Sequence, residues 1–176
     1  MHLFGTFQVL GIYFKHLNFK KMEVQTKKEL KVEFLQVEMP SIVGNSCSAC
    51  DTVQDKLISA IKDVQLLFDN LDCKIDFKST TIKTIEEAEN AQITASPTIK
   101  VGNLVFYPDH LTDSSEAREW TWNGLTMPEP NKQTLIEVLL KGYFEPKGKN
   151  EKKKISPYIL KHINESDITK PVCGCS

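Results

Sequence analysis

Two cysteines separated by two residues are the best candidates for chemistry in this chain. Cys47 and Cys50 lie in the sequence Cys-Ser-Ala-Cys, and the apolar residues Val53 and Leu57 follow Cys50 at helical spacing. The pattern predicts a helix that begins at the pair, with Cys50 on its buried stripe and Cys47 at its N-terminal end. Unpaired amide donors and the helix dipole favour an anion there, which lowers the pKa of a thiol. Cys47 is therefore the expected nucleophile, and Cys50 the expected resolving thiol.

A proline in the sequence Ser96-Pro97-Thr98 is the second candidate element. It precedes a predicted strand that contains Ile99 and Val101. Proline holds a cis peptide bond with a small penalty, so we expect the bond before Pro97 to be cis. Such a bond would turn a backbone edge toward the dithiol, and an extended substrate segment would pair with that edge. Ser96, Pro97 and Thr98 are accordingly the predicted substrate-binding residues.

A second close pair of cysteines, Cys173-Gly-Cys175, lies near the end of the sequence. Two thiols on a short arc suit chelation of a soft metal or metalloid ion, or a strained and easily reduced disulfide. About 30 residues separate Gly142 from Cys173, so a flexible tail would span roughly 30 Å, more than a domain radius of about 13 Å. We expect the tail to reach Cys47, as an electron shuttle or as part of a shared metal site. The alternative is that the tail pair has no function.

Five cysteines are an odd number, and their arrangement in two close pairs and a singleton is unlike the framework of a disulfide-stapled secreted domain. The singleton, Cys73, alternates with Ile75 and Phe77, which predicts a small buried core residue. Three interpretations of the Cys47/Cys50 pair stay open: redox chemistry, binding of a metal or metalloid, and an inert pair on a binding domain.

Alternating strand and helix patterns surround the candidate residues. The sequence predicts a strand over 29–38, an amphipathic helix over about 48–69, a strand from Cys73 to Lys78 and a short helix ending near Ala91. Thr84 and Glu87 have the spacing of a capping box at the start of that short helix. A third strand follows directly from Pro97.

Two hairpins and a last helix complete the pattern. Gly102-Asn103 and Asn123-Gly124 are two-residue turn signals, and Trp120 and Trp122 share one face of the second hairpin, where we expect them to pack. His110 is predicted to be a surface-loop residue, since one His and one Asp do not make a metal site. Asn131 is the predicted cap of the last helix, which Gly142 would close.

This order of elements is that of an α/β sandwich with a mixed central sheet. Together with Cys47-Ser-Ala-Cys50 and Ser96-Pro97-Thr98, it resembles the thioredoxin superfamily, which implies a thioredoxin-like three-layer α/β/α sandwich. Residues 29–143 also resemble an uncharacterised thioredoxin-like family known only as a domain of unknown function. The resemblance implies that Cys47, Cys50 and Pro97 are active-centre positions.

The sequence departs from thioredoxin itself next to the cysteines. Asn45-Ser46 stands where an aromatic residue usually precedes the motif, and Ser48-Ala49 stands where Gly-Pro usually lies between the cysteines. Those positions tune the redox potential and recognition by a reductase. The resemblance therefore supports the class of chemistry more strongly than general thioredoxin activity.

We divide the chain into an N-terminal extension (1–28), a thioredoxin-like domain (29–145) and a charged linker with a Cys-Gly-Cys tail (146–176). The apolar stretch over 3–14 is too short to span a bilayer and lacks the flanks of a signal peptide, which disfavours export. A further hypothesis is that translation starts at Met22. The lysine-rich run over 147–154 is a predicted solvated linker, and 157–162 is predicted to form one short helical turn.

The function predicted from these features is that of a cytoplasmic thiol-disulfide oxidoreductase without an organic cofactor. Its partners would be a protein or small-molecule disulfide and a cellular thiol reductant. Twenty-two basic side chains balance twenty-three acidic ones, so we expect no nucleic acid as partner. We expect no membrane either, because the apolar stretch over 3–14 is too short to span one. The alternative is a protein that binds zinc, arsenic(III) or another soft ion between Cys47/Cys50 and Cys173/Cys175.

Overall fold

The computed structural model describes residues 28–38, 48–111, 117–145 and 154–168, and of residues 48–51 and 165–168 it describes the backbone alone. The apolar N-terminal stretch, the lysine-rich run and the Cys173/Cys175 pair lie outside the described residues. The expectations for those segments therefore stay predictions.

A four-stranded mixed sheet forms the centre of the protein. It comprises β1 (Lys28–Val37), β2 (Cys73–Ile82), β3 (Thr98–Val101) and β4 (Leu104–Phe106), in the order β2-β1-β3-β4. β1 is parallel to β2 and antiparallel to β3, and β3 and β4 form an antiparallel hairpin. The prediction of an α/β fold with a mixed sheet is confirmed at this level.

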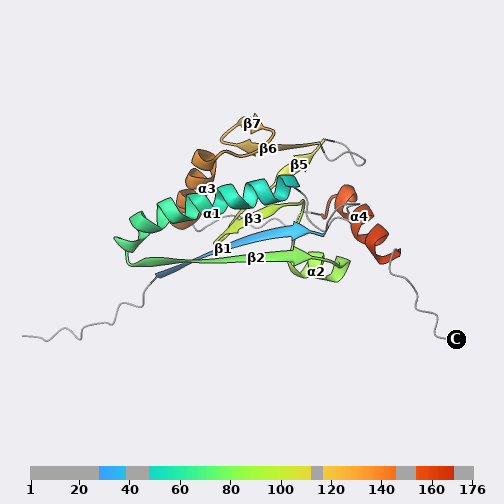
Figure 1. Ribbon diagram of the computed structural model, residues 1–176, viewed down its shortest axis with the longest axis horizontal. Coiled ribbons are helices and arrows are strands. Elements are labelled where there is room, and N and C mark those ends of the chain that lie inside the picture. The colour runs from blue at the N-terminus through green and yellow to red at the C-terminus, as the bar shows by residue number, and fades with distance from the viewer. Residues whose placement is uncertain (1–27, 39–47, 112–116, 146–153, 169–176) are drawn as a thin grey trace, which may run out of the picture.

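Helices pack on both faces of this sheet: α1 (Ser48–Asp69) and α3 (Lys132–Phe144) on one face, and α2 (Ile85–Asn90) and α4 (Pro157–Ile168) on the other. The alternation of side chains along β1 explains this arrangement. Val32 and Phe34 point toward α1 and α3, whereas Leu35 and Val37 point toward α2 and α4. Figure 1 shows α4 at the end of the sheet where β1 ends.

The first core, which we call the α1–α3 cluster, is the larger of the two. It contains aliphatic and aromatic residues from α1, α3 and the four-stranded sheet, and Trp120 from a further strand. Phe68 of α1 is fully buried and lies against Tyr143 of α3, with the ring centroids 4.6 Å apart. Cys73 is buried in this cluster, which confirms its predicted place in the core.

The second core, which we call the α2–α4 cluster, is smaller. Its buried members are Leu35, Val37, Ile82, Ala88, Ile93, Tyr158, Ile159 and Ile163. Three of these residues come from α4, where we predicted only one helical turn within a linker and tail. The helix is twelve residues long and contributes directly to the core. Ser156 and Pro157 are the local signal for its start, because serine is a preferred helix cap and proline suits the first helical position.

Most predicted element positions are confirmed. The first helix spans 48–69 as expected, and β2 continues to Ile82, four residues beyond the predicted end. Thr84 accepts a hydrogen bond from the backbone N–H of Glu87, and Asn131 caps α3 by accepting one from Thr134 at 2.9 Å.

The prediction that Gly142 closes the last helix is wrong, because α3 continues to Phe144. Gly142 instead lies where α3 crosses β3. A Cβ atom at this position would lie 2.7 Å from the carbonyl oxygen of Val101, closer than real side chains come. The glycine therefore permits close packing of the helix on the strand.

A second, three-stranded antiparallel sheet follows β4. It has the order β5-β6-β7, with β5 (Pro108–His110), β6 (Arg118–Trp122) and β7 (Leu125–Met127). Asn123 and Gly124 form the turn between β6 and β7, with φ angles of 50° and 80°. Trp120 and Trp122 both pack against Phe106, as we expected, so this sheet is anchored to the larger one by aromatic contacts.

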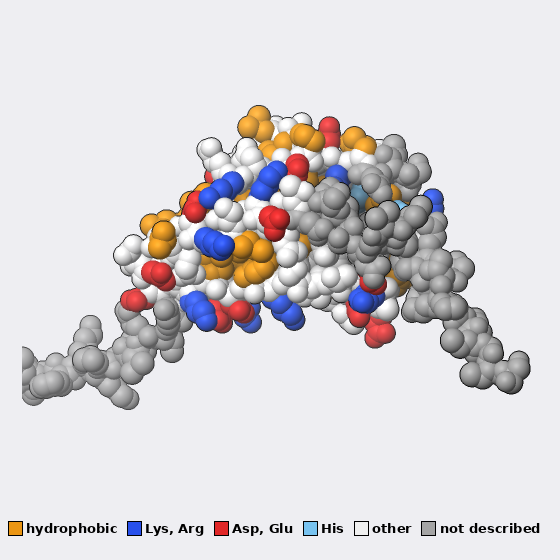
Figure 2. All heavy atoms as spheres, viewed as in Figure 1, with side chains coloured by type: hydrophobic (Ala, Val, Ile, Leu, Met, Phe, Trp, Pro, Cys, Tyr) orange, Lys and Arg blue, Asp and Glu red, His pale blue; other side chains and the backbone are white. Residues whose placement is uncertain are grey.

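The outer edge of the larger sheet is protected by polar groups. On β2, the exposed side chains of Lys74, Asp76 and Lys78 alternate with the buried Cys73 and Ile75 and the partly buried Phe77. Figure 2 shows basic and acidic side chains together along the lower edge of the molecule. Charged residues on an edge strand oppose pairing with other chains.

Candidate active site at the cis-proline

The cis peptide bond lies beside the carboxyl end of β1. Leu35 is paired with Thr98, the first residue of β3, and Pro97 directly precedes Thr98. The bond between Ser96 and Pro97 is cis, as we expected. The Ser96 Oγ accepts a hydrogen bond from the backbone N–H of Val37 at 3.0 Å. The residue before the proline is thus tied to the last residue of β1.

Two glutamines of α1 fix the direction of this helix along β2. The Gln65 side chain donates a hydrogen bond to the carbonyl of Cys73 at 3.2 Å and accepts one from the N–H of Ile75 at 3.0 Å. Eleven residues earlier, Gln54 accepts a hydrogen bond from the hydroxyl of Ser79 at 3.2 Å. The later part of α1 therefore lies at the start of β2, and its earlier part lies farther along β2. The helix consequently runs antiparallel to the strand.

The first turn of α1 lies at the same end of the sheet as the cis bond. Ser79, the partner of Gln54, lies in the same row across the sheet as Ile99. The four residues from Gln54 back to Cys50 cover about 6 Å of helix, and the two residues from Ile99 back to Pro97 cover a similar length of strand. The backbone at Cys50 is therefore level with Pro97 along the sheet, and Figure 1 shows α1 beginning at the end where β1 finishes.

The predicted site residues have different outcomes. Cys47, Cys173 and Cys175 lie outside the described residues, and of Cys50 only the backbone is described. What the structure brings to one end of the sheet is the first turn of α1 and the segment Ser96–Thr98. The helix start offers backbone amides and the positive end of the helix dipole, which favour an anionic group such as a thiolate.

The hydroxyl groups of the proline segment serve the fold. Ser96, Pro97 and Thr98 are all buried. The Thr98 Oγ1 donates a hydrogen bond to the carbonyl of Ala95 at 2.6 Å, and the Ser96 Oγ is bonded to Val37. Both hydroxyls therefore have partners within the fold, and the prediction that this segment binds a substrate stays a prediction.

Arg118 reaches this segment from the second sheet, which we did not predict. Its Nη1 donates a hydrogen bond to the carbonyl oxygen of Ser96 at 2.8 Å. This oxygen belongs to the cis peptide group itself. One signal in the sequence pointed to the residue: Arg118 is the only arginine among twenty-two basic side chains. Arginine and lysine are not equivalent where a planar group must be held, so a single arginine in a lysine-rich chain is informative.

His110 is not the surface-loop residue that we predicted. It is the last residue of β5, it is only partly exposed, and its ring stacks on Tyr158 of α4 at 4.4 Å between centroids. Burial, the nearby Arg118 guanidinium and His162 lower the pKa of His110, and Asp109 opposes them. Neither ring nitrogen of His110 has a hydrogen-bond partner in the described part of the chain. The neutral form of His110 is consequently favoured.

The segment before α4 is attached next to the proline segment. The backbone N–H of Ser156 donates a hydrogen bond to the carbonyl of Thr94 at 2.9 Å, two residues before Ser96. Together with the stacking of Tyr158 on His110, this bond holds α4 at the same end of the molecule. Part of the segment expected to be linker and tail therefore borders the candidate site.

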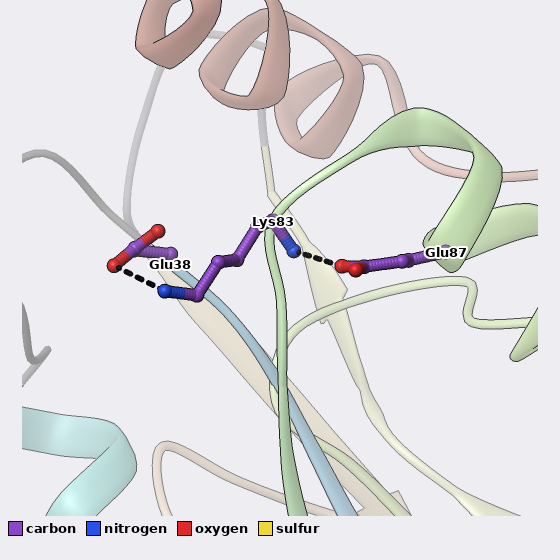
Figure 3. Close-up of polar contacts among 3 residues, drawn as sticks. All are labelled: Glu38, Lys83 and Glu87. Atoms are coloured by element: carbon purple, nitrogen blue, oxygen red, sulfur yellow. Dashed lines mark hydrogen bonds and ion pairs between the residues drawn. The ribbon is translucent and has the colours of Figure 1, made fainter.

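Lys83 links Glu38, the residue after β1, to Glu87 of α2 (Figure 3). The Lys83 Nζ forms an ion pair with a carboxylate oxygen of Glu38 at 3.5 Å, and its backbone N–H donates to the Glu87 carboxylate at 2.7 Å. The backbone N–H of Glu38 also donates to the carbonyl of Ile82 at 2.9 Å. These contacts fix Glu38, the last described residue before the segment 39–47. In an ideal capping box, the Glu87 carboxylate would accept a hydrogen bond from the backbone N–H of Thr84. Here it accepts one from the backbone N–H of Lys83 instead.

The described residues contain no group of three or more His, Cys, Asp or Glu side chains that could hold a metal ion. Within the same ranges, none of the helices has both the length and the apolar character needed to cross a bilayer.

No protein-family model, curated protein or solved structure matches this chain. The structure shows a mixed α/β protein whose cis-proline lies at the same end of the four-stranded sheet as the start of α1. The resemblance to thioredoxin-like proteins stays a prediction.

Proposed function

We propose that this protein is a thiol-disulfide oxidoreductase of the cytoplasm that uses Cys47 and Cys50. The observation that carries the proposal is the placement of the first turn of α1, which follows Cys47 directly, at the sheet end that holds the cis Ser96–Pro97 bond. The helix start favours a thiolate, and in this proposal an extended substrate segment binds next to the proline segment.

The topology adds support for a thioredoxin-like fold. Strand, helix, strand, helix, two antiparallel strands and a helix occur in that order, and the sheet has the order β2-β1-β3-β4. This is the arrangement that the resemblance to the thioredoxin superfamily implies. The second sheet and α4 are additions to it. Both additions lie next to the proline segment.

The proposed reaction moves two electrons from the dithiol to a disulfide. The Cys47 thiolate attacks one sulfur of the substrate disulfide, the substrate S–S bond breaks, and the other sulfur leaves as a thiolate that takes up a proton. The Cys50 thiolate then attacks the Cys47 sulfur of the mixed disulfide. The second substrate thiol is released, and a Cys47–Cys50 disulfide remains. A cellular thiol reductant returns this disulfide to the dithiol, so no organic cofactor is needed.

The test combines a reductase assay with alkylation. We expect the protein to reduce insulin with dithiothreitol as electron donor, and we expect Cys47→Ser to abolish this activity. Cys50→Ser should trap a mixed disulfide on Cys47. Cys73→Ser is the matched control, because this thiol is buried in the α1–α3 cluster and should not contribute to activity.

The pH dependence of iodoacetamide alkylation at Cys47 is the second measurement. We expect the pKa of the Cys47 thiol to lie below the usual value of about 8.5. No activity together with an ordinary thiol pKa would contradict the proposal. Zinc or arsenic(III) retained at stoichiometric amounts, and lost on substitution of either cysteine pair by serine, would favour the binding protein instead.

A further inference from the structure

Three exposed apolar side chains lie where α1 and α3 end, and we call them the apolar end patch. Leu67 in the last turn of α1 is 48% exposed, Leu71 in the turn after α1 is 41% exposed, and Phe144, the last residue of α3, is 64% exposed. Figure 2 shows hydrophobic side chains on the surface near the end of the molecule where α1 ends (Figure 1). Since α1 has 22 residues and is about 33 Å long, this end is far from the cis-proline.

Aromatic contacts join the ends of the two helices beside the patch. The ring of Phe68 lies 4.6 Å from that of Tyr143, and the ring of Tyr143 lies 4.9 Å from that of Phe144. The backbone N–H of Leu71 donates to the carbonyl of Phe68 at 2.9 Å, so the turn after α1 is fixed next to the same contact. The exposed side chains therefore surround the buried ring of Phe68.

Leu67 is on the side of α1 that faces α3. Asp63, four residues earlier and on the same side of the helix, forms an ion pair with Lys132 of α3 at 2.6 Å. Leu66 points elsewhere, because it is about 200° around the helix from the buried Phe68 and so faces away from the sheet. Leu66 is therefore not a member of the patch.

The chain enters β1 between the members of the patch. The backbone N–H of Lys28 donates to the carbonyl of Asp72 at 3.0 Å, and the Lys28 Nζ lies 5.9 Å from the centre of the Tyr143 ring. Asp72 follows Leu71 in sequence, and Tyr143 precedes Phe144. Whatever precedes Lys28 is consequently attached to the protein next to the apolar end patch.

The segment over 3–14 has the composition to cover this patch. Eight of its twelve residues are large and apolar: Leu3, Phe4, Phe7, Val9, Leu10, Ile12, Tyr13 and Phe14. Thirteen residues, 15–27, connect it to Lys28. A connection of this length spans at most about 45 Å and about 20 Å on average as a random chain, so the segment can reach the patch. The attachment also gives it a high effective concentration there.

Charge and size favour this segment over a second copy of the protein. The last turn of α1 contains no basic residue, and Asp69 and Asp72 are exposed there. The negative end of the helix dipole favours cations, and residues 15–27 contain four lysines and one acidic residue. A stable complex buries about 800 Å² per partner, contributed by some 20–30 residues, and three side chains provide much less.

We propose that residues 3–14 bind to the apolar end patch of the same chain, which makes the patch an intramolecular docking surface. The contact buries apolar side chains of both parts, and the lysines of 15–27 lie near the acidic end of α1. This inference does not rest on the proposed function, because the patch lies at the end of α1 opposite Cys47 and Cys50. It requires that the protein include the residues before Met22.

Photo-crosslinking in the full chain tests the contact. The photoreactive residue benzoylphenylalanine replaces Phe7, which keeps an apolar ring at that position, and the products are identified by mass spectrometry after irradiation. We expect a product within one chain that joins residue 7 to residues 67–72 or 143–145. Its yield should not depend on the protein concentration.

Variants of the patch measure its contribution. Leu67→Gln combined with Phe144→Gln should shift the equilibrium toward the released segment about tenfold, because two partly exposed apolar side chains lose the contact. The yield of the product should fall accordingly. Leu66→Gln is the matched control, since it makes the same change on the same helix at a side chain that faces away, and the yield should be kept. Circular dichroism checks that each variant folds.

A second pair of substitutions keeps the test decisive if the patch variant does not fold. Leu10→Ser with Phe14→Ser changes the other side of the contact and leaves the patch intact, so we expect a similar fall in yield. Thr6→Ser is the control for these changes and should keep the yield. An undiminished yield in the folded double variants would overturn the inference.

Other results would also overturn it. A product between two chains whose yield rises with protein concentration would assign the patch to a second copy. Flotation of the full chain with phosphatidylcholine vesicles, lost in Leu10→Ser with Phe14→Ser, would assign the segment to a membrane. No product on the patch, or a native protein that begins at Met22, would remove the contact itself. Failure of the proposed function looks different, because insulin reduction would then be absent while the product within one chain is still formed.

Discussion

The two faces of the four-stranded sheet are built in different ways. The α1–α3 cluster is formed by long elements whose apolar residues recur at regular spacing, such as Val53, Leu57 and Val64 on α1. The α2–α4 cluster joins a six-residue helix to a helix from the far end of the chain. The first face is a continuous core, whereas the second depends on a contact between distant segments. The second face also borders the cis-proline. The packing of α4 on this face is therefore connected with the geometry of the candidate site.

The largest effect is expected on the first face. Phe68→Ala removes a fully buried ring that lies against Tyr143, and it should lower the free energy of unfolding by about 3–5 kcal/mol. Urea denaturation followed by circular dichroism measures this loss. Leu66→Ala on the same helix is the control, because Leu66 is 73% exposed and its loss should change stability by less than about 0.5 kcal/mol. Similar losses in both variants would contradict the account of the core.

A smaller and more local effect is expected on the second face. Ile159→Ala should destabilise the protein by about 2 kcal/mol, because Ile159 is fully buried in the α2–α4 cluster. Hydrogen exchange should show faster exchange in α4 while Val32 of β1 keeps its protection, since peripheral units open independently of the core. The exposed residue Asn164 gives the control, Asn164→Ala. Equal acceleration in α4 and β1 would show that the two faces unfold as one unit.

Gly142 tests how closely α3 approaches β3 on the first face. Alanine is normally preferred over glycine within a helix by about 0.5–1 kcal/mol. At this position, however, its Cβ would lie 2.7 Å from the Val101 carbonyl oxygen. We expect Gly142→Ala to destabilise the protein by about 1–3 kcal/mol, as overpacking does. Stabilisation in urea denaturation would mean that the helix lies farther from the strand.

The smallest effect concerns the pH dependence of the second face. Burial, Arg118 and His162 lower the pKa of His110, against the opposing effect of Asp109, so the unfolded chain binds a proton at higher pH than the folded protein. The stability that neutral His110 contributes is therefore fully present above about pH 6.5, the ordinary pKa of histidine. It decreases as the pH falls toward the lower pKa of His110 in the folded protein.

His110→Phe tests this sign while it keeps a ring for stacking on Tyr158. Urea denaturation at pH 7.5 and pH 5.5 should show a smaller loss of stability on acidification in the variant than in the unaltered protein. An identical loss in both proteins would mean that His110 is not held in its neutral form.

Local signals in the sequence predicted much of the fold. Helix α1, the caps at Thr84 and Asn131, and the turn at Asn123-Gly124 each follow from residues within a few positions of one another. The cis bond before Pro97 also agrees with the prediction from its place at the head of a strand.

The parts that were missed depend on contacts between distant residues. The bond from Arg118 to Ser96 joins two sheets, and the stacking of His110 on Tyr158 joins β5 to α4. No periodicity within either segment encodes such a pairing. Gly142 was misread for the same reason, since its close approach to Val101 is a property of the packed structure.

The most direct test of the central claim is the equilibrium of the Cys47/Cys50 pair with reduced and oxidised glutathione, followed by mass spectrometry of trapped thiols. We predict a single two-electron transition that forms a Cys47–Cys50 disulfide, is absent in Cys50→Ser and is unchanged in Cys73→Ser. A chain in which no glutathione ratio joins these two cysteines would contradict the account.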